Sequence, residues 1–253
     1  MTTAIPPVKA RSPLSERLDL IISPIFAAAL AILGLAVWTY SDLDKITIAI
    51  LSPDKIQRQI VETLILGLTS SILVVLIAVP VGILVTRKGY PRLKSALVNT
   101  LGLGQALPAY GLIVIFFSFM GSGIVTVILA LATFSLLPVL RNTIVGLEQV
   151  DKSVIDAARG MGLTARQILL KIELPLSVEV ILGGIRTAVV INIGFSALAF
   201  LVGGGGLGET INSGLKLDRG PAILIGAVMV AIMALLFDFL SALAQKYLKP
   251  KGL

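Results

Sequence analysis

Side chains able to do chemistry are sparse in this chain of 253 residues, and cysteine and histidine are absent altogether. Their absence excludes thiolate chemistry, disulfide bonds, the usual zinc sites and a histidine base. The apolar segments hold no paired Asp, Glu, Lys, Ser or Tyr at matching depth, and no G-x-x-x-x-G-K-[ST] phosphate loop occurs. We therefore expect neither an intramembrane enzyme nor a chain that hydrolyses ATP by itself.

A run of five glycines and one leucine, from Gly203 to Gly208, has the G-x-G-x-x-G spacing of a dinucleotide fingerprint. That fingerprint works between a strand and a helix of a βαβ unit. Here an apolar helical segment precedes the run, so we reject a dinucleotide site. We interpret the run as a helix end where the backbone needs close approach or unusual dihedral angles.

Residues 148–178 are the longest polar interruption of the chain, and we call this segment the polar hairpin. Ser153 and Asp156 have the spacing of a capping box, which predicts that a first short helix starts at Ser153. Gly160 and Gly162 are predicted to end that helix, because glycine tolerates the left-handed conformation of a helix end.

A second short helix is predicted to follow in the polar hairpin. Thr164 is expected to cap it, with Gln167 three residues later as the reciprocal partner. Pro175 lacks an N–H group and is predicted to stop this helix. The segment is therefore interpreted as two short helices with a break between them.

The composition indicates a membrane protein. Only 14% of the residues are charged, against about 25% in soluble domains, and the mean hydropathy is +0.99. A membrane span takes roughly 20 apolar residues, so we expect an all-α, polytopic protein with about six transmembrane helices. The predicted organisation is a cytoplasmic tail at 1–17, a first transmembrane helix at 18–40 and a core domain at 59–245. The expected spans are 18–40, 62–86, 97–120 (bent at Pro108), 124–147, 179–202 and 221–244.

The charge distribution predicts the orientation. Sixteen lysines and arginines fall on the side of the polar hairpin and five on the other. Basic residues favour cytoplasmic loops, so we expect both termini and the polar hairpin in the cytoplasm, and the segments 41–58 and 203–220 outside. The net charge of +7 is then explained by loops facing anionic lipid, not by nucleic acid. The five outer residues are Lys45, Lys55, Arg58, Lys216 and Arg219.

The polar hairpin resembles the signature of permease subunits of bacterial ABC importers, which reads Glu-Ala-Ala, three residues, Gly, nine residues, Ile-x-Leu-Pro. The one departure is aspartate at the first position. The resemblance implies the type I importer permease fold and a coupling helix that docks into the ATPase subunit. The matching residues are Asp156, Ala157, Ala158, Gly162, Ile172, Leu174 and Pro175.

The same resemblance implies an assembly in the bacterial inner membrane. We expect two copies of an ATP-binding subunit, a second permease copy or a paralogue, an extracellular solute-binding protein, and surrounding membrane lipid. No cofactor is expected on this chain, because ATP and Mg would bind the partner ATPase. In this reading the chain is a pore-forming subunit and not an enzyme.

Three further segments resemble the osmoprotectant permeases, which move glycine betaine, choline or carnitine. They are Leu136–Thr143, Ala157–Gly162 and Gly184–Ala188. The run Ala106–Tyr110 departs from the Ile-Pro-Ser-Leu-like run of that subfamily. Importers of amino acids or other small polar solutes stay as the alternative. An ion-coupled secondary transporter is a further one, although it would need a buried acid near the bilayer midplane.

Polar residues inside spans often line pathways, but hydrogen bonds between helices are at least as common. A role of the glycine run in an external gate is suggested by the resemblance, with a plain loop as the alternative. Near the inner interface, Arg186 is expected to reach the surface or pair with a loop acid, and Asp238, near the end of the sixth span, is expected to reach the surface likewise. The candidates for the translocation path or gate are Gln105, Tyr110, Asn192, Ser196, Gly205, Gly206 and Gly208.

Overall fold

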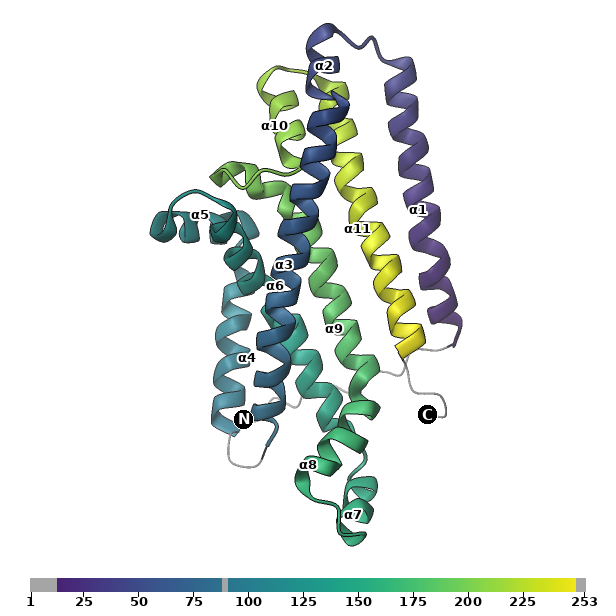
Figure 1. The fold of residues 1–253 in the computed structure, drawn as a ribbon, viewed down its shortest axis with the longest axis vertical. Helices are drawn as coiled ribbons and strands as arrows, with labels where there is room; N and C mark the ends of the chain where they lie inside the picture. The colour runs from purple at the N-terminus through teal and green to yellow at the C-terminus, as the bar shows by residue number, and fades with distance from the viewer. Residues whose placement is uncertain (1–12, 88–90, 249–253) are drawn as a thin grey trace.

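The computed structural model describes residues 13–87 and 91–248, and these residues form helices without a strand. Expectations that concern residues 1–12, 88–90 and 249–253 lie outside the described residues. Figure 1 shows the helices as an elongated bundle. Its elements are α1 (Pro13–Tyr40), α2 (Lys45–Ile50), α3 (Pro53–Val85), α4 (Pro91–Ala106), α5 (Ala109–Met120), α6 (Ile124–Glu148), α7 (Lys152–Gly160), α8 (Ala165–Ile168), a π-helical turn (Leu169–Glu173), α9 (Leu174–Phe195), a 3₁₀ segment (Ser196–Val202), α10 (Gly208–Lys216) and α11 (Gly220–Leu248).

Five helical stretches are long and apolar enough to cross a membrane, and α4 with α5 makes a sixth if the pair counts as one span. The expectation of about six spans is met in this sense, but the third span is not a bent helix. It is two helices at an angle of 101°. The residue before a proline is pushed out of the helical region, and Pro108 itself has an extended backbone with ψ 138°. The break follows from that geometry.

Several helices extend beyond the predicted spans into the expected loops. The segment 41–58 holds α2 and the first turn and a half of α3, which begins at Pro53 and not at Glu62. Proline suits a first helical position, since its missing N–H would be unpaired there anyway. Likewise, 203–220 contains α10, α1 begins at Pro13, and α9 begins at Leu174.

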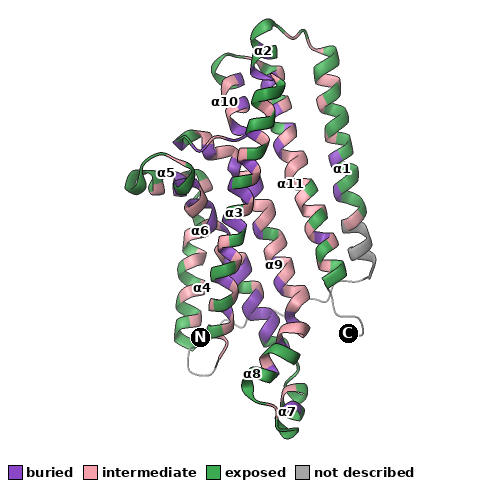
Figure 2. Ribbon diagram, in the orientation of Figure 1, coloured by how far each residue is buried: buried purple, intermediate pink, exposed green. Residues whose placement is uncertain are grey.

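The core lies along α3, α6 and α9, where Figure 2 shows most of the buried residues. Glycines bring these helices into close contact, as small residues do in membrane bundles. A Cβ on Gly82 of α3 would lie 2.6 Å from the Thr143 methyl group of α6, and one on Gly184 of α9 would lie 2.7 Å from the Asn142 Cβ of α6. Helix α1 packs mainly on α11 and is largely exposed.

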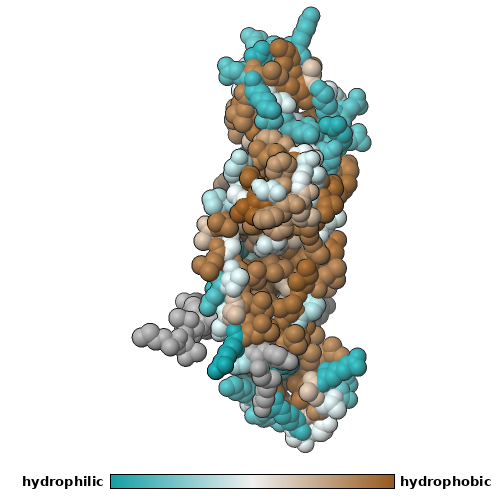
Figure 3. All heavy atoms as spheres, turned by 90° about the vertical axis from the view of Figure 1, so that its left-hand side faces the viewer, coloured by the Kyte–Doolittle hydropathy of each residue, from teal (hydrophilic) through white to brown (hydrophobic). Residues whose placement is uncertain are grey.

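The two ends of the bundle are polar and the middle is apolar. Figure 1 places α7, α8, the start of α1 and the end of α11 at one end, and α2 and α10 at the other. Figure 3 shows a broad apolar band between two hydrophilic ends. This pattern is that of a protein crossing the membrane several times, with the polar hairpin on one side and the glycine run towards the other.

An ion pair joins two spans near the hairpin end. Arg186 of α9 donates two hydrogen bonds to Asp238 of α11, at 2.5 and 2.6 Å, and Ser23 of α1 donates a third at 2.6 Å. The expectation that Arg186 pairs with a loop acid is therefore wrong, because its partner is a carboxylate in another span. A paired, hydrogen-bonded charge is the form in which ions are tolerated away from water.

Candidate functional site: a polar hairpin and a glycine loop joined by α3

The first helix of the polar hairpin, α7, is capped by Asp151. Its carboxylate accepts a hydrogen bond from the Ser153 backbone N–H at 2.8 Å. The predicted cap, Ser153, is therefore wrong by two residues. Both are good capping residues, and the aspartate one step before the first helical residue takes the position. The hydrogen bonds from Ser153 hold the pKa of Asp151 below its ordinary value.

Glycine ends α7, as predicted. Gly162 has φ +81°, and its N–H donates to the Arg159 carbonyl at 2.9 Å. The N–H of Leu163 donates to the Ala158 carbonyl at 3.1 Å. This pair of bonds is the Schellman motif, which satisfies the last carbonyls of a helix and needs a left-handed residue at this position.

The second short helix, α8, begins as predicted but does not stop at Pro175. Thr164 and Gln167 form the capping box. A π-helical turn then joins α8 to α9, with the N–H of Leu174 donating to the Leu169 carbonyl. Pro175 lies in the first turn of α9. The proline ring displaces the carbonyl four residues before it, and the wider π turn accommodates that displacement, so the helix continues.

The signature residues divide into an exposed and a packed group. Asp156, Ala157 and Gly162 are exposed, whereas Ala158 is buried. Asp156 pairs with Arg159 at 3.0 Å on the surface, a contact worth little in stability. Ile172, Leu174 and Pro175 are half-buried where the hairpin meets the bundle. Exposed apolar side chains lie on the same hairpin, as expected for a surface that a partner covers. They are Val154, Met161 and Leu170.

A partly buried ion pair ties the hairpin to the end of α3. Glu173, the last residue of the π turn, is only 8% exposed, and its Oε2 lies 2.7 Å from Nη1 of Arg87. Arg87 also donates to the Ile83 carbonyl and the Thr86 hydroxyl, both at 3.2 Å. This pair was not predicted from the sequence. The sequence signal that could have indicated it is Glu173 itself, a single acid directly before the Leu-Pro pair at which an apolar span starts.

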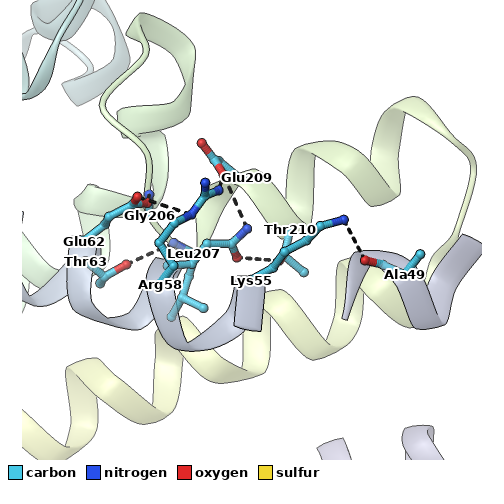
Figure 4. A network of polar contacts seen from close by, with 10 residues as sticks. Ala49, Lys55, Arg58, Glu62, Thr63, Gly206, Leu207, Glu209 and Thr210 are labelled. Atoms are coloured by element: carbon cyan, nitrogen blue, oxygen red, sulfur yellow. Dashed lines mark hydrogen bonds and ion pairs between the residues drawn. The ribbon is translucent and has the colours of Figure 1, made fainter. Parts of the chain in front are cut away.

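The glycine run is held by one face of α3 (Figure 4). We call residues 203–207 the glycine loop, and two of its backbone N–H groups are bonded by side chains of α3. Gly206 N–H donates to Oε2 of Glu62 at 2.8 Å, and Leu207 N–H donates to the Thr63 hydroxyl at 3.0 Å. Gly205 has φ +76° and Gly206 has φ +89°, so the loop needs glycine where it meets α3.

Two further contacts continue this face into α10. The Thr210 hydroxyl donates to Oε1 of Gln59 at 2.6 Å, and Arg58 pairs with Glu209 at 3.0 Å. The backbone at Gly208 lies very close to the backbone of the 3₁₀ segment, since a Cβ on Gly208 would lie 1.8 Å from the Ala197 carbonyl oxygen. The gate candidates therefore lie in one continuous, closely packed segment. They are Gly205, Gly206 and Gly208. Whether that structure gates a pathway stays a prediction.

The intramembrane candidates Asn192 and Ser196 are buried inside the bundle, and Ser196 lies beside Gly206 of the glycine loop. Asn192 is buried, and in the orientation that gives both ends of its amide a partner, the nitrogen faces Ser135 Oγ at 2.9 Å and the oxygen faces Ser71 Oγ at 3.0 Å. Ser196 is buried and donates to the Ile193 carbonyl. Both residues thus make bonds within the bundle, and a role in the pathway stays a prediction.

The other two candidates flank the break between α4 and α5. Gln105 donates to the Phe134 carbonyl at 3.1 Å. Phe134 precedes Pro138 by four residues, so its carbonyl lacks the usual helical partner, and Gln105 supplies one. Tyr110 lies on α5 with its side chain half-exposed. A lining role for either residue stays a prediction.

Replacing Asp151 by alanine is expected to increase hydrogen exchange of the first α7 amides several-fold, because the cap is lost, whereas Asp151→Asn keeps it. The pH dependence has a defined sign. The pKa of Asp151 is lowered in the folded chain, so the charged cap contributes at and above the ordinary pKa of 3.8 and is lost as pH falls through the lowered value. Exchange mass spectrometry measures this, and equal exchange in both variants would contradict it.

Comparisons with known proteins converge on one family. Residues 78–251 match the model of the binding-protein-dependent transport system inner membrane component. The carnitine transport permease protein OpuCB of Listeria monocytogenes is 38% identical over 76% of this chain and 87% of its own length. The glycine betaine/carnitine/choline transport system permease protein OpuCB of Bacillus subtilis is 37% identical over 76% of this chain and 88% of its own. An inward-facing structure of the MetNI methionine ABC transporter superposes with a TM-score of 0.69 at 24% identity, over 82% of this chain and all of that one.

Proposed function

Because the chain belongs to the family of binding-protein-dependent transport system inner membrane components, we propose that it is the permease subunit of an ATP-driven importer of glycine betaine, carnitine or choline. The fold is that of a type I ABC importer permease. The observation that carries the proposal is the polar hairpin, which presents Asp156, Gly162 and exposed apolar side chains at one polar end of a membrane-spanning bundle. A separate ATP-binding subunit would dock there.

The assembly follows from what this chain lacks and presents. No phosphate loop occurs in the sequence, so ATP and Mg would bind to two copies of the partner subunit. A second permease copy or a paralogue would complete the pore. The polar hairpin and both termini would face the cytoplasm, because the basic residues concentrate at that end. Closure of the ATPase subunits on ATP would draw the two hairpins together and turn the pore outward.

The solute class rests on the relatives. Curated proteins 37–38% identical to this chain are named for carnitine, glycine betaine and choline transport. A quaternary ammonium group is bound best by aromatic faces, and only 6% of this chain is aromatic. An extracellular binding protein would therefore supply most of the recognition, and the permease would supply a path.

Two measurements test the proposal. Deleting the gene is expected to abolish ATP-dependent uptake of labelled glycine betaine, carnitine or choline, and the gene carrying Gly162→Val is not expected to restore it. A β-branched residue at φ +81° is strained, so the docking surface should distort and the ATPase subunit should no longer co-purify. Gly160→Ala, at a helical position with open space around its Cβ, is the matched control. Retained uptake and co-purification in Gly162→Val would contradict the docking role, and unchanged uptake on deletion would redirect the search to amino acids.

A further inference from the structure

We propose that α3 transmits displacement of the polar hairpin to the glycine loop, with Arg87 and Glu173 as positioning residues at the hairpin end. The inference rests on the proposed function, because it concerns how ATPase movement reaches the far side of the membrane. Its basis is that side chains near both ends of α3 contact these two elements: Arg87, two residues beyond Val85, contacts the polar hairpin, and the first turns of α3 contact the glycine loop. We call Arg87–Glu173 the hairpin clamp, and the contacts of Gln59, Glu62 and Thr63 with residues 206–210 the loop clamp.

The hairpin clamp fixes a charge of the hairpin to the end of α3. The Arg87 guanidinium is held on α3 by the Ile83 carbonyl and the Thr86 hydroxyl, and its remaining Nη1 meets Glu173 at 2.7 Å. Glu173 is 8% exposed. Separating the two groups would leave the Glu173 carboxylate without a partner in a poorly hydrated place, whereas the Arg87 side chain is 35% exposed. The two groups should therefore move together when the hairpin moves.

The π turn concentrates movement next to this clamp. Residues 169–173 are π-helical between two α-helical stretches, and such turns mark weak points of a helix, often at functional sites. A force on the hairpin would act first on this turn and only partly along α9. Glu173 is the last residue of this turn. A displacement of the turn would therefore also act on α3, through the ion pair with Arg87.

The loop clamp is built from a single helical face. Gln59, Glu62 and Thr63 are spaced i, i+3, i+4, which places them side by side on α3. They bond the Thr210 hydroxyl, the Gly206 N–H and the Leu207 N–H (Figure 4). Two of these three bonds end on loop backbone, so a shift of α3 changes the path of the glycine loop directly.

Between the clamps α3 is one unbroken helix. From Thr63 to its end at Val85 it spans 22 residues, about 33 Å at 1.5 Å per residue, and it continues through Pro80. Arg87 follows two residues after this end. It packs against α6 and α9 through Gly82 and Gly67. Close contacts at glycine constrain the lateral position of α3. Its two ends are bonded to the polar hairpin and to the glycine loop.

The test uses the whole transporter in membrane vesicles, with the co-purifying ATP-binding subunit and binding protein loaded with glycine betaine. In Glu173→Ala, the Arg87 side chain that is left behind is 35% exposed and keeps its bonds to the Ile83 carbonyl and the Thr86 hydroxyl. ATPase association and basal hydrolysis are therefore expected to stay within about twofold of the unmodified complex. Stimulation of hydrolysis by loaded binding protein, and uptake, are expected to fall at least tenfold. The charge swap Arg87→Glu with Glu173→Arg should recover a large part of both. Glu148→Ala breaks a pair between α6 and α4 at the same end and is the matched control.

A second readout follows the signal itself. The chain has no cysteine, so Leu201→Cys, a partly exposed site just before the glycine loop, gives it a single thiol. ATP with vanadate is expected to change the labelling rate of this thiol in the otherwise unmodified chain and not in Glu173→Ala. Normal stimulation and uptake in Glu173→Ala, a charge swap no better than the single variant, or loss of the ATPase subunit from Glu173→Ala would each overturn the inference. Absence of the ATPase subunit from the unmodified complex would instead refute the proposed function.

Discussion

Gly208→Ala is expected to abolish uptake and to lower the apparent melting temperature of the detergent-solubilised permease. A Cβ on Gly208 would lie 1.8 Å from the carbonyl oxygen of Ala197 and 2.7 Å from its carbon. These are backbone atoms, so no side-chain rotation relieves the clash and the start of α10 must move. Overpacking typically costs about 1–3 kcal/mol of folding free energy. For a backbone clash this close, we expect a cost at or above the upper limit of that range.

The matched control for this prediction is Gly194→Ala. Gly194 lies in α9, and a Cβ there would meet nothing within 4 Å. Alanine is favoured over glycine inside a helix by about 1 kcal/mol, so the control should be neutral or stabilising. A thermal shift of the fluorescent-tagged protein and solute uptake measure both variants. Normal stability and uptake in Gly208→Ala would show that the glycine run is an ordinary loop.

Asp238→Ala is expected to be the most damaging single loss of charge in the spans. Arg186 and Asp238 are 13% and 19% exposed, and removing one partner of a buried pair costs about 3–5 kcal/mol because the other charge is left without compensation. We expect little folded protein after extraction. Replacing both residues by leucine should recover most of the stability, since a well-packed apolar pair is often no worse than a buried ion pair.

Glu148→Ala is the control for the ion-pair prediction. It removes the partner of Lys94 at 2.6 Å on a more exposed surface, where such pairs contribute about 1 kcal/mol or less. Size-exclusion profiles and melting temperatures in one detergent compare the variants. If the double leucine variant were as unstable as Asp238→Ala, the damage would come from lost shape and not from the uncompensated arginine.

Local rules predicted the ends of short helices well where a single residue type fits. Gly162 closes a Schellman motif just beyond Gly160, the last residue of α7, and Thr164 has its reciprocal Gln167, so both predictions are confirmed. The cap of α7 failed because Asp151 and Ser153 compete for it within three residues. Sequence spacing does not decide which of the two residues caps the helix. The direction from which the chain enters the helix decides it.

Prolines show where tertiary structure takes over. Pro108 and Pro175 were both expected to disturb a helix, yet one produces a break of 101° and the other is carried through a π turn. The difference lies in what can supply the missing hydrogen bonds and absorb the displaced carbonyl. Neither is visible in a single sequence, because the compensating groups come from neighbouring turns or other helices.

The two ends of α3 were missed for a related reason. Gln59, Glu62 and Thr63 have the spacing of one helical face, and that signal was available. It was lost because the span was placed from Glu62, which left Gln59 outside the predicted helix. The pairing of Arg87 with Glu173 joins residues 86 positions apart, and only the packing of α3 beside the π turn brings them together.

The break between α4 and α5 has a consequence for biosynthesis. Neither helix alone is long and apolar enough to count as a membrane span, and only the pair passes. In contrast, α1 is strongly apolar and faces its surroundings on most sides, so it can leave the translocon for lipid by itself. The α4–α5 segment should instead wait at the translocon until α6 emerges, because Gln105 finds its partner carbonyl there. Insertion of the middle of this chain is then a joint event of three helices.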